Sequence, residues 1–220
     1  HIAIGADSRN AFNSYDRGVM WPLIRTHFPH LESLLRLMYG TSASIFVPTD
    51  SSPATISNEV GSRQGCSWGS FLYCMALQPV INQLQEEFPS CLIVAYCDDV
   101  HILGPPAAAA RALERYGILL HDILQQELRP DKTTVFAPSY TLADIRSAPH
   151  SLPSVIPDNK IHFDGIRVLG CPIGSTDFKA RFAIETASSI AKDLTTVSLC
   201  PSLHVQYLLT LKSVQHSITH

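Results

Sequence analysis

Several features that would narrow the function at once are missing from this chain of 220 residues. No stretch comes near the roughly 18 uninterrupted apolar residues of a membrane-spanning helix, so we expect no membrane partner. The start at His1 lacks the charged-then-apolar pattern of a signal peptide and suggests a fragment of a longer protein. The chain also has no excess of basic over acidic residues. The 16 Lys and Arg face 19 Asp and Glu, and the resulting formal charge of −3 does not indicate nucleic-acid binding.

Cysteine pairs are also lacking, because the six cysteines include no C-x-x-C motif and no regular spacing. Four of the six lie in apolar runs, where a free cysteine behaves as a small hydrophobic residue. This distribution favours reduced thiols over a disulfide framework or a zinc site, and therefore an intracellular protein, in the nucleus or the cytoplasm. What the chain does have is a hydrophobic content of 45%, enough for a buried core.

The apolar pattern predicts strands and helices in an order typical of an α+β fold. Expected strands are 1–6, 44–47, 54–60, 91–96, 100–103, 133–136, 161–163 and 166–169, the last two joined by a turn at Asp164-Gly165. Expected helices are 16–39, split in two by Pro22 and Pro29, then 70–88, 107–128 and the region beyond 174, with a loop at 140–160. This order predicts helices packed on one face of an antiparallel sheet.

Three carboxylates stand out from the apolar strands. Asp98 and Asp99 are adjacent in the turn of a hairpin, where two like charges resist joint ionisation unless a cation is bound. Magnesium prefers such oxygen ligands together with substrate phosphates, although an Asp-Asp pair taken alone is more often a solvated turn. Asp7 ends another strand, and the three acids meet at one edge if both strands belong to one sheet. That arrangement suits two-metal phosphoryl transfer.

Five short motifs, in order along the chain, resemble those of reverse transcriptases, and their details are closest to the polymerases of non-LTR retrotransposons. They are Asp7-Ser-Arg-Asn-Ala-Phe12, Gly61-Ser-Arg-Gln-Gly-Cys-Ser-Trp-Gly-Ser-Phe-Leu72, Tyr96-Cys-Asp-Asp99, Leu128-Arg-Pro-Asp-Lys-Thr133 and Val168-Leu-Gly-Cys-Pro-Ile-Gly174. The resemblance implies a polymerase palm over 1–174, which is a ferredoxin-like or RRM-like antiparallel sheet with helices on one face. It further implies a fingers-side hairpin at 41–60 and the start of a helical thumb at 175–220. The fingers, absent here, would lie upstream.

The resemblance implies catalytic roles for four residues. Asp7 and Asp98 would bind two Mg²⁺ ions, with Mn²⁺ as a substitute, and Asp99 would support the site. Lys132 would donate a proton to the pyrophosphate leaving group, although a lone lysine after a helix is more often a surface charge.

Substrate contacts are implied in the same way. The implied nucleotide-binding residues are Ala11, Phe12, Arg63, Gln64 and Gly65. The residues implied for primer and template are Tyr96, Leu169 and Gly170. Phe12 would exclude a 2′-hydroxyl and so favour deoxynucleotides, whereas its spacing alone fits a core aromatic equally well.

The implied function is RNA-directed DNA polymerisation, with an RNA template, a DNA primer and dNTPs as partners. The missing fingers and thumb segments of the parent polyprotein would also be partners, so we expect weak activity or none from the fragment alone. Two alternatives stay open. One is an RNA-directed RNA polymerase, against which Phe12 argues. The other is a domesticated or decayed retroelement domain that only binds or scaffolds, against which the intact Asp7, Asp98 and Asp99 argue.

Overall fold

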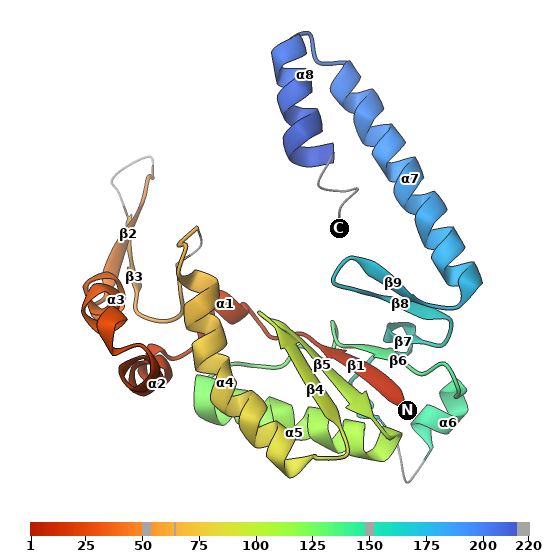
Figure 1. Ribbon diagram of the computed structural model, residues 1–220, viewed down its shortest axis with the longest axis horizontal. Helices are drawn as coiled ribbons and strands as arrows, with labels where there is room; N and C mark the ends of the chain where they lie inside the picture. Colours follow the sequence, from red (N-terminus) through yellow and green to blue (C-terminus); the bar gives the residue numbers. More distant parts are fainter. Residues whose placement is uncertain (50–53, 64, 148–151, 215–220) are drawn as a thin grey trace. The chain divides into compact units, whose positions relative to one another are not determined.

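The computed structural model describes residues 1–49, 54–63, 65–147 and 152–214 (Figure 1). The chain divides into two compact units, His1–Ile161 and His162–His220. Within the described ranges, no helix is both long enough and apolar enough to cross a membrane. The assignment of 1–174 to a palm and of 175–220 to a thumb stays a prediction.

The first unit is built around a sheet whose strands follow the spatial order β4-β5-β1-β6-β7. These strands are β1 (Ile2–Ala6), β4 (Leu92–Tyr96), β5 (Asp99–Gly104), β6 (Thr134–Phe136) and β7 (Ile161–His162). Strand β1 is antiparallel to both β5 and β6, and β4 is antiparallel to β5. The mixed α+β class and the predicted strands at 1–6, 91–96, 100–103 and 133–136 are therefore confirmed, within a residue or two at their ends.

One face of this sheet is buried against helices α4 (Gly69–Glu87) and α5 (Pro106–Leu124), which both pack on the strands and on each other (Figure 1). Side chains alternate along a strand, so every second residue points to the helices. The buried ones include Ile2, Ile4, Ile93, Val100 and Ile102. Each such side chain contributes about 1.5–3 kcal/mol on burial. The opposite face carries exposed side chains, among them Leu92 at 58% and Val94 at 44%. The predicted packing of helices on one face is confirmed.

Helix α5 shows the predicted apolar stripe, with Leu113, Tyr116, Leu120 and Leu124 all buried. The helix ends at Leu124 and not at Leu128, because Gln125 adopts a left-handed backbone conformation (φ 56°) at its C-cap. The four residues that follow therefore leave the helix as an irregular segment, and this segment contributes to the site described below.

Helices α4 and α5 are also joined at the surface by a bidentate ion pair. The guanidinium of Arg115 donates to both carboxylate oxygens of Glu87 at 2.7 and 2.8 Å. Hydrogen bonds from Arg115 and from Gln83 lower the pKa of the Glu87 carboxyl from 4.5 to about 2.

The lowered pKa predicts how this pair depends on pH. The folded state favours ionised Glu87, so the stabilisation is complete above pH 4.5 and is lost as the pH falls towards 2. We expect Glu87→Gln to lower the urea midpoint at pH 7 but to match the wild type at about pH 2. The exposed neighbour supplies the control Glu86→Gln, which should change neither value. An undiminished difference at low pH would contradict the assignment.

Between β1 and α4 the described residues form three short α-helices, two 3₁₀-helical turns and a hairpin. These elements are α1 (Ala11–Ser14), η1 (Arg17–Val19), α2 (Met20–His27), η2 (Pro29–Leu31), α3 (Glu32–Tyr39), β2 (Ala43–Val47) and β3 (Ala54–Asn58). The antiparallel β2–β3 hairpin confirms the prediction for this region. The predicted break at Pro22 is wrong, since Pro22 lies in the first turn of α2, where no backbone donor is needed. Only Pro29 separates two helices.

The region 140–160, predicted as a loop, contains a short helix, α6 (Leu142–Arg146), and a helical turn, η3 (Asp158–Lys160). Thr141 and Asp144 form a capping box at the start of α6, each side chain accepting from the other residue's backbone N–H. The Thr-x-x-Asp spacing was the available signal, and the surrounding prolines and serines obscured it.

The second unit opens with an antiparallel hairpin of β8 (Gly165–Val168) and β9 (Cys171–Gly174). Its two-residue turn is Leu169-Gly170, both with positive φ (47° and 84°), as the Leu-Gly motif implied.

The predicted turn at Asp164-Gly165 is wrong. Gly165 is a glycine because the Phe178 ring packs against its α-carbon, and Asp164 binds Ser175 and Arg181. The helical prediction beyond 174 is confirmed by α7 (Thr176–Ser198), α8 (Leu203–Leu209) and the π-helical turn η4 (Thr210–Val214).

Candidate active site

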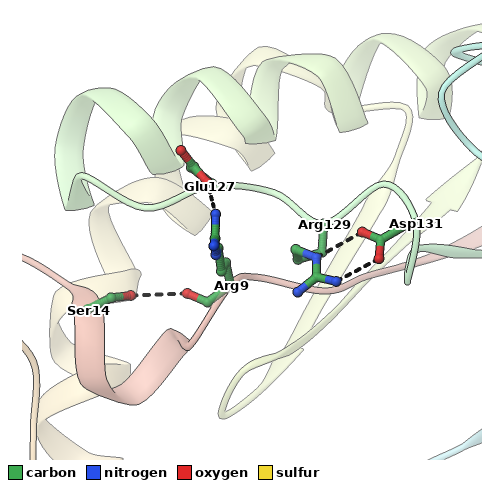
Figure 2. Close-up of polar contacts among 5 residues, drawn as sticks. All are labelled: Arg9, Ser14, Glu127, Arg129 and Asp131. Carbon is green, nitrogen blue, oxygen red and sulfur yellow. Dashed lines mark hydrogen bonds and ion pairs between the residues drawn. The ribbon is translucent and has the colours of Figure 1, made fainter.

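The segment that leaves β1 runs beside the irregular segment that follows α5. The backbone N–H of Arg9 donates to Glu127 O at 2.9 Å, and that of Arg129 donates to Asp7 O at 2.8 Å. Figure 2 shows the side chains that reinforce this contact, with Arg9 Nη1 on Glu127 Oε2 at 3.0 Å. The guanidinium of Arg129 is held by Asp131 at 2.6 and 2.8 Å (Figure 2). The first and fourth sequence motifs are therefore neighbours in space.

This contact places Lys132 at the same cavity as Asp7. The cavity has a volume of about 450 Å³, and its lining includes Asp98 from the β4–β5 turn. Of the residues predicted for the site, seven line it: Asp7, Ala11, Phe12, Arg63, Gly65, Asp98 and Lys132. Segments from four of the five motifs thus meet around one cavity, whose lining includes two carboxylates and two cationic side chains.

The other predicted site residues do not line this cavity. Asp99 begins β5 and is exposed, and Tyr96, paired with it across the hairpin, is 63% exposed. Gln64 lies outside the described residues. Leu169 and Gly170 belong to the second unit.

The acidic turn itself is tight, because Tyr96 and Asp99 are the last registered pair and only Cys97 and Asp98 join them. Cys97 adopts a left-handed conformation (φ 54°) that such two-residue loops require. Partial burial, together with the negative charges of Asp98 and Asp7, raises the pKa of the Asp99 carboxyl. The negative charges of Asp7 and Asp98 therefore act on the Asp99 carboxyl, and the binding of a common metal by the three acids stays a prediction.

The donor set of this cavity fits a hard divalent cation. Mg²⁺ is commonly held by one or two carboxylates and completed by substrate phosphates and water, not by an all-protein cage. Asp7 and Asp98 supply those two carboxylates at one cavity. A ready-made cage is absent from the part of the chain that the structure describes, since no three His, Cys, Asp or Glu side chains there are grouped to hold a metal.

One wall of the cavity is made by residues 61–63, which are attached to the α1 region by backbone hydrogen bonds. Gly61 N donates to Tyr15 O at 2.8 Å and Ser62 N donates to Phe12 O at 2.6 Å. Gly61 has φ 61°, and a β-carbon there would collide with the backbone of Asn13. Glycine is thus required for this close approach.

Arg17 secures the same wall and was not predicted from the sequence. This side chain is only 6% exposed, and it donates to Gly61 O at 2.7 Å, to Val60 O at 3.1 Å and to Asn58 O at 3.2 Å. Its guanidinium also lies 5.1 Å from the ring centre of Tyr39. A single arginine in a short helical turn gives no sequence signal for such a role.

A buried polar network beneath the cavity was missed as well. Gln126, 1% exposed, donates to Ala11 O at 2.6 Å and to Ser14 Oγ at 3.1 Å, and accepts from the Tyr73 hydroxyl at 3.4 Å. The Tyr73 ring lies 5.0 Å from that of Phe12. Buried polar groups are costly unless paired, so this network fixes the position of α1 and of the Phe12 ring.

No protein-family model matches the chain. A curated protein that is similar to it is the retrotransposable element SLACS 132 kDa protein of Trypanosoma brucei gambiense. The two are 30% identical over 123 residues, which cover 51% of this chain and 10% of that protein. The chain therefore spans about a tenth of the length of this distant relative.

Proposed function

From this distant relation to a retrotransposable-element protein, we propose that the chain contains the palm of an RNA-directed DNA polymerase. Such an enzyme transfers a nucleotide from a dNTP to the 3′-hydroxyl of a primer on an RNA template. The observation that supports this most is that Asp7 and Asp98, far apart in sequence, line one cavity with Lys132 and Phe12. The connection β1–α4–β4–β5–α5–β6 adds support, because it follows the β-α-β-β-α-β order of ferredoxin-like sheets.

The carboxylates would act by binding metal. Asp7 and Asp98 would hold two Mg²⁺ ions, and Asp99 would add negative charge beside them. When bound, the ions would supply activation of the attacking hydroxyl and neutralisation of the phosphate charge. Asp7 follows the end of β1 and Asp98 lies in a tight turn, so the backbone would hold the two negative charges in fixed positions. Charges fixed in this way supply most of the rate enhancement of phosphoryl-transfer enzymes.

The remaining lining residues would bind and orient the substrate. Lys132, on the turn after Arg129, would donate a proton to the leaving pyrophosphate. Arg63 would contact phosphate with the part of its guanidinium not used by Met38 O, to which Nη2 donates at 2.6 Å. Gly65 has nothing within 4 Å of its α-carbon's open side, which lets a nucleotide approach the backbone closely.

Phe12 would select the sugar, because its ring is held between the cavity and Tyr73. We expect Phe12→Val to raise the use of ATP relative to dATP about tenfold, since a smaller side chain removes the clash with a 2′-hydroxyl. The matched control is Phe46→Val, at an exposed position of β2, which should leave the ratio unchanged. An unchanged ratio in Phe12→Val would exclude a role for this ring in sugar selection.

Primer extension on an RNA template tests the proposed function, with this chain and with a longer protein that contains it. Incorporation of dNTPs that depends on Mg²⁺ or Mn²⁺ is the expected result, and incorporation of rNTPs alone would indicate an RNA polymerase. If neither form incorporates nucleotides and neither binds Mn²⁺ in calorimetry, the proposal fails and a binding or scaffolding role takes its place.

A further inference from the structure

All six cysteines of the chain are free, and two of them lie together behind the acidic turn. Cys74 of α4 and Cys97 of the β4–β5 turn line one cavity of about 180 Å³, together with Leu77, Gln78, Ile81 and Ala95. This cavity differs from the candidate active site, whose lining includes neither thiol.

The local geometry explains why the two thiols meet. Along β4, Ile93 points to the helices, so Ala95, two residues further on, is on the same side, and Cys97 of the following turn lines the same cavity as Ala95. Along α4, Cys74, Gln78 and Ile81 are spaced as neighbours on one helical stripe. Helix α4 packs on β4, and the two rows therefore face each other.

The two cysteines line the same small cavity and are reachable from solvent. Burial, with the neighbouring Cys97, raises the pKa of the Cys74 thiol. Cys74 is nevertheless an exposed residue and Cys97 is partly exposed, so a small oxidant can reach the pair. Cys91, in contrast, is buried.

We propose that Cys74 and Cys97 form a reversible disulfide that ties the acidic turn to helix α4. The oxidant is a low-molecular-weight disulfide such as oxidised glutathione. The Cys74 thiol, which its raised pKa makes slow to react at neutral pH, attacks as the thiolate one sulfur of that disulfide, which releases one glutathione thiol and leaves a mixed disulfide. Cys97 then attacks the Cys74 sulfur and displaces the second glutathione. Two protein thiols and one glutathione disulfide are thus converted to one protein disulfide and two glutathione thiols.

The consequence for activity rests on the proposed function. Cys97 directly precedes Asp98, so a covalent bond from Cys97 to α4 would restrain the turn that presents this carboxylate. A shift of about 1 Å in a catalytic group can lower the rate by about a hundredfold. We therefore expect the oxidised protein to extend primers much more slowly than the reduced protein.

Peptide mapping of the full chain tests the disulfide without reference to any activity. Oxidation with oxidised glutathione and blocking with N-ethylmaleimide would be followed by digestion with trypsin and Glu-C. Trypsin alone leaves all four central cysteines in one peptide, because no Lys or Arg lies between Arg63 and Arg111, whereas Glu-C cuts at Glu86 and Glu87. The expected product joins the Cys74 and Cys97 peptides, with the mass of two hydrogens lost.

The variants decide between this disulfide and unselective oxidation. The linked product should persist in Cys171→Ser and disappear in Cys74→Ser and Cys97→Ser. Glutathione attached to either thiol without a link between them, or links that involve Cys66 or Cys91 instead, would overturn the proposal.

Primer extension before and after oxidation tests the consequence separately. The wild type should slow about a hundredfold and recover with dithiothreitol, and Cys74→Ser should not respond to the oxidant. A disulfide that forms without slowing extension overturns the effect on the turn. If a longer protein that contains this chain extends no primer in either state, the result counts against the polymerase function, while the peptide map still decides on the disulfide.

Discussion

Replacing Asp98 with asparagine is expected to slow primer extension by about a thousandfold. Asparagine keeps the size of the side chain but removes the negative charge that a divalent cation needs. Charge stabilisation by a bound metal is worth several kcal/mol in the transition state, and about 4 kcal/mol corresponds to this factor. Because Asp7 lines the same cavity, Asp7→Asn should produce a loss of similar size.

The control for this charge change is Asp193→Asn, on an exposed position of α7, which should extend primers at the wild-type rate. Calorimetric titration with Mn²⁺ separates a lost metal site from a folding defect, since Asp98→Asn should unfold at the wild-type temperature yet release less heat on binding. Equal Mn²⁺ affinity in wild type and variant, or a rate reduced less than tenfold, would refute the role assigned to Asp98.

The second large effect is expected on stability, from Arg17→Met. Methionine fills similar space but leaves three carbonyl groups without their donor, the buried one of Gly61 and the partly buried ones of Asn58 and Val60. Hydrogen bonds to a charged group contribute about 1.5–3 kcal/mol each, and removal of the buried charge offsets part of the loss. We expect the free energy of unfolding to fall by about 3 kcal/mol, measured by urea denaturation.

Arg25→Met is the matched control, because Arg25 is exposed on α2 and only pairs with Glu32 at the surface. Exposed ion pairs contribute about 0–1 kcal/mol, so this variant should stay near the wild-type stability. If Arg17→Met also stays within 1 kcal/mol of the wild type, the wall formed by residues 61–63 does not depend on this arginine.

The sequence predicted the sheet and its helices well, because each depends on a repeated pattern. The short apolar runs at 91–96 and 100–103, on either side of a polar turn, are typical of a hairpin, and the stripe through Leu113, Tyr116 and Leu120 can bury one side only as a helix. The same patterns placed Asp7 and Asp98 at the ends of strands that are now seen in one sheet, with β5 next to β1.

The predictions that were wrong or missing concern features that depend on single tertiary contacts. The Asp-Gly pair at 164–165 has the composition of a tight turn. In the structure, however, the Phe178 ring packs against Gly165 and the Asp164 carboxylate accepts from Arg181. Arg17 and Gln126 were missed for the same reason. Each is a single polar residue whose hydrogen-bond partners lie more than forty positions away along the chain. A repeating sequence pattern gives no information about such a contact.

The hydrogen bonds from Gly61 to Tyr15 and from Ser62 to Phe12 close a long excursion of the chain. Residues 16–60, with two helices and the β2–β3 hairpin, depart from and return to adjacent points of the backbone. The entropy of closing a loop changes only slowly with its length, so insertions or deletions inside the excursion leave its anchor points in place. Evolution can therefore remodel this part of the protein, and acquire new binding partners through it, while the neighbouring chemistry is preserved.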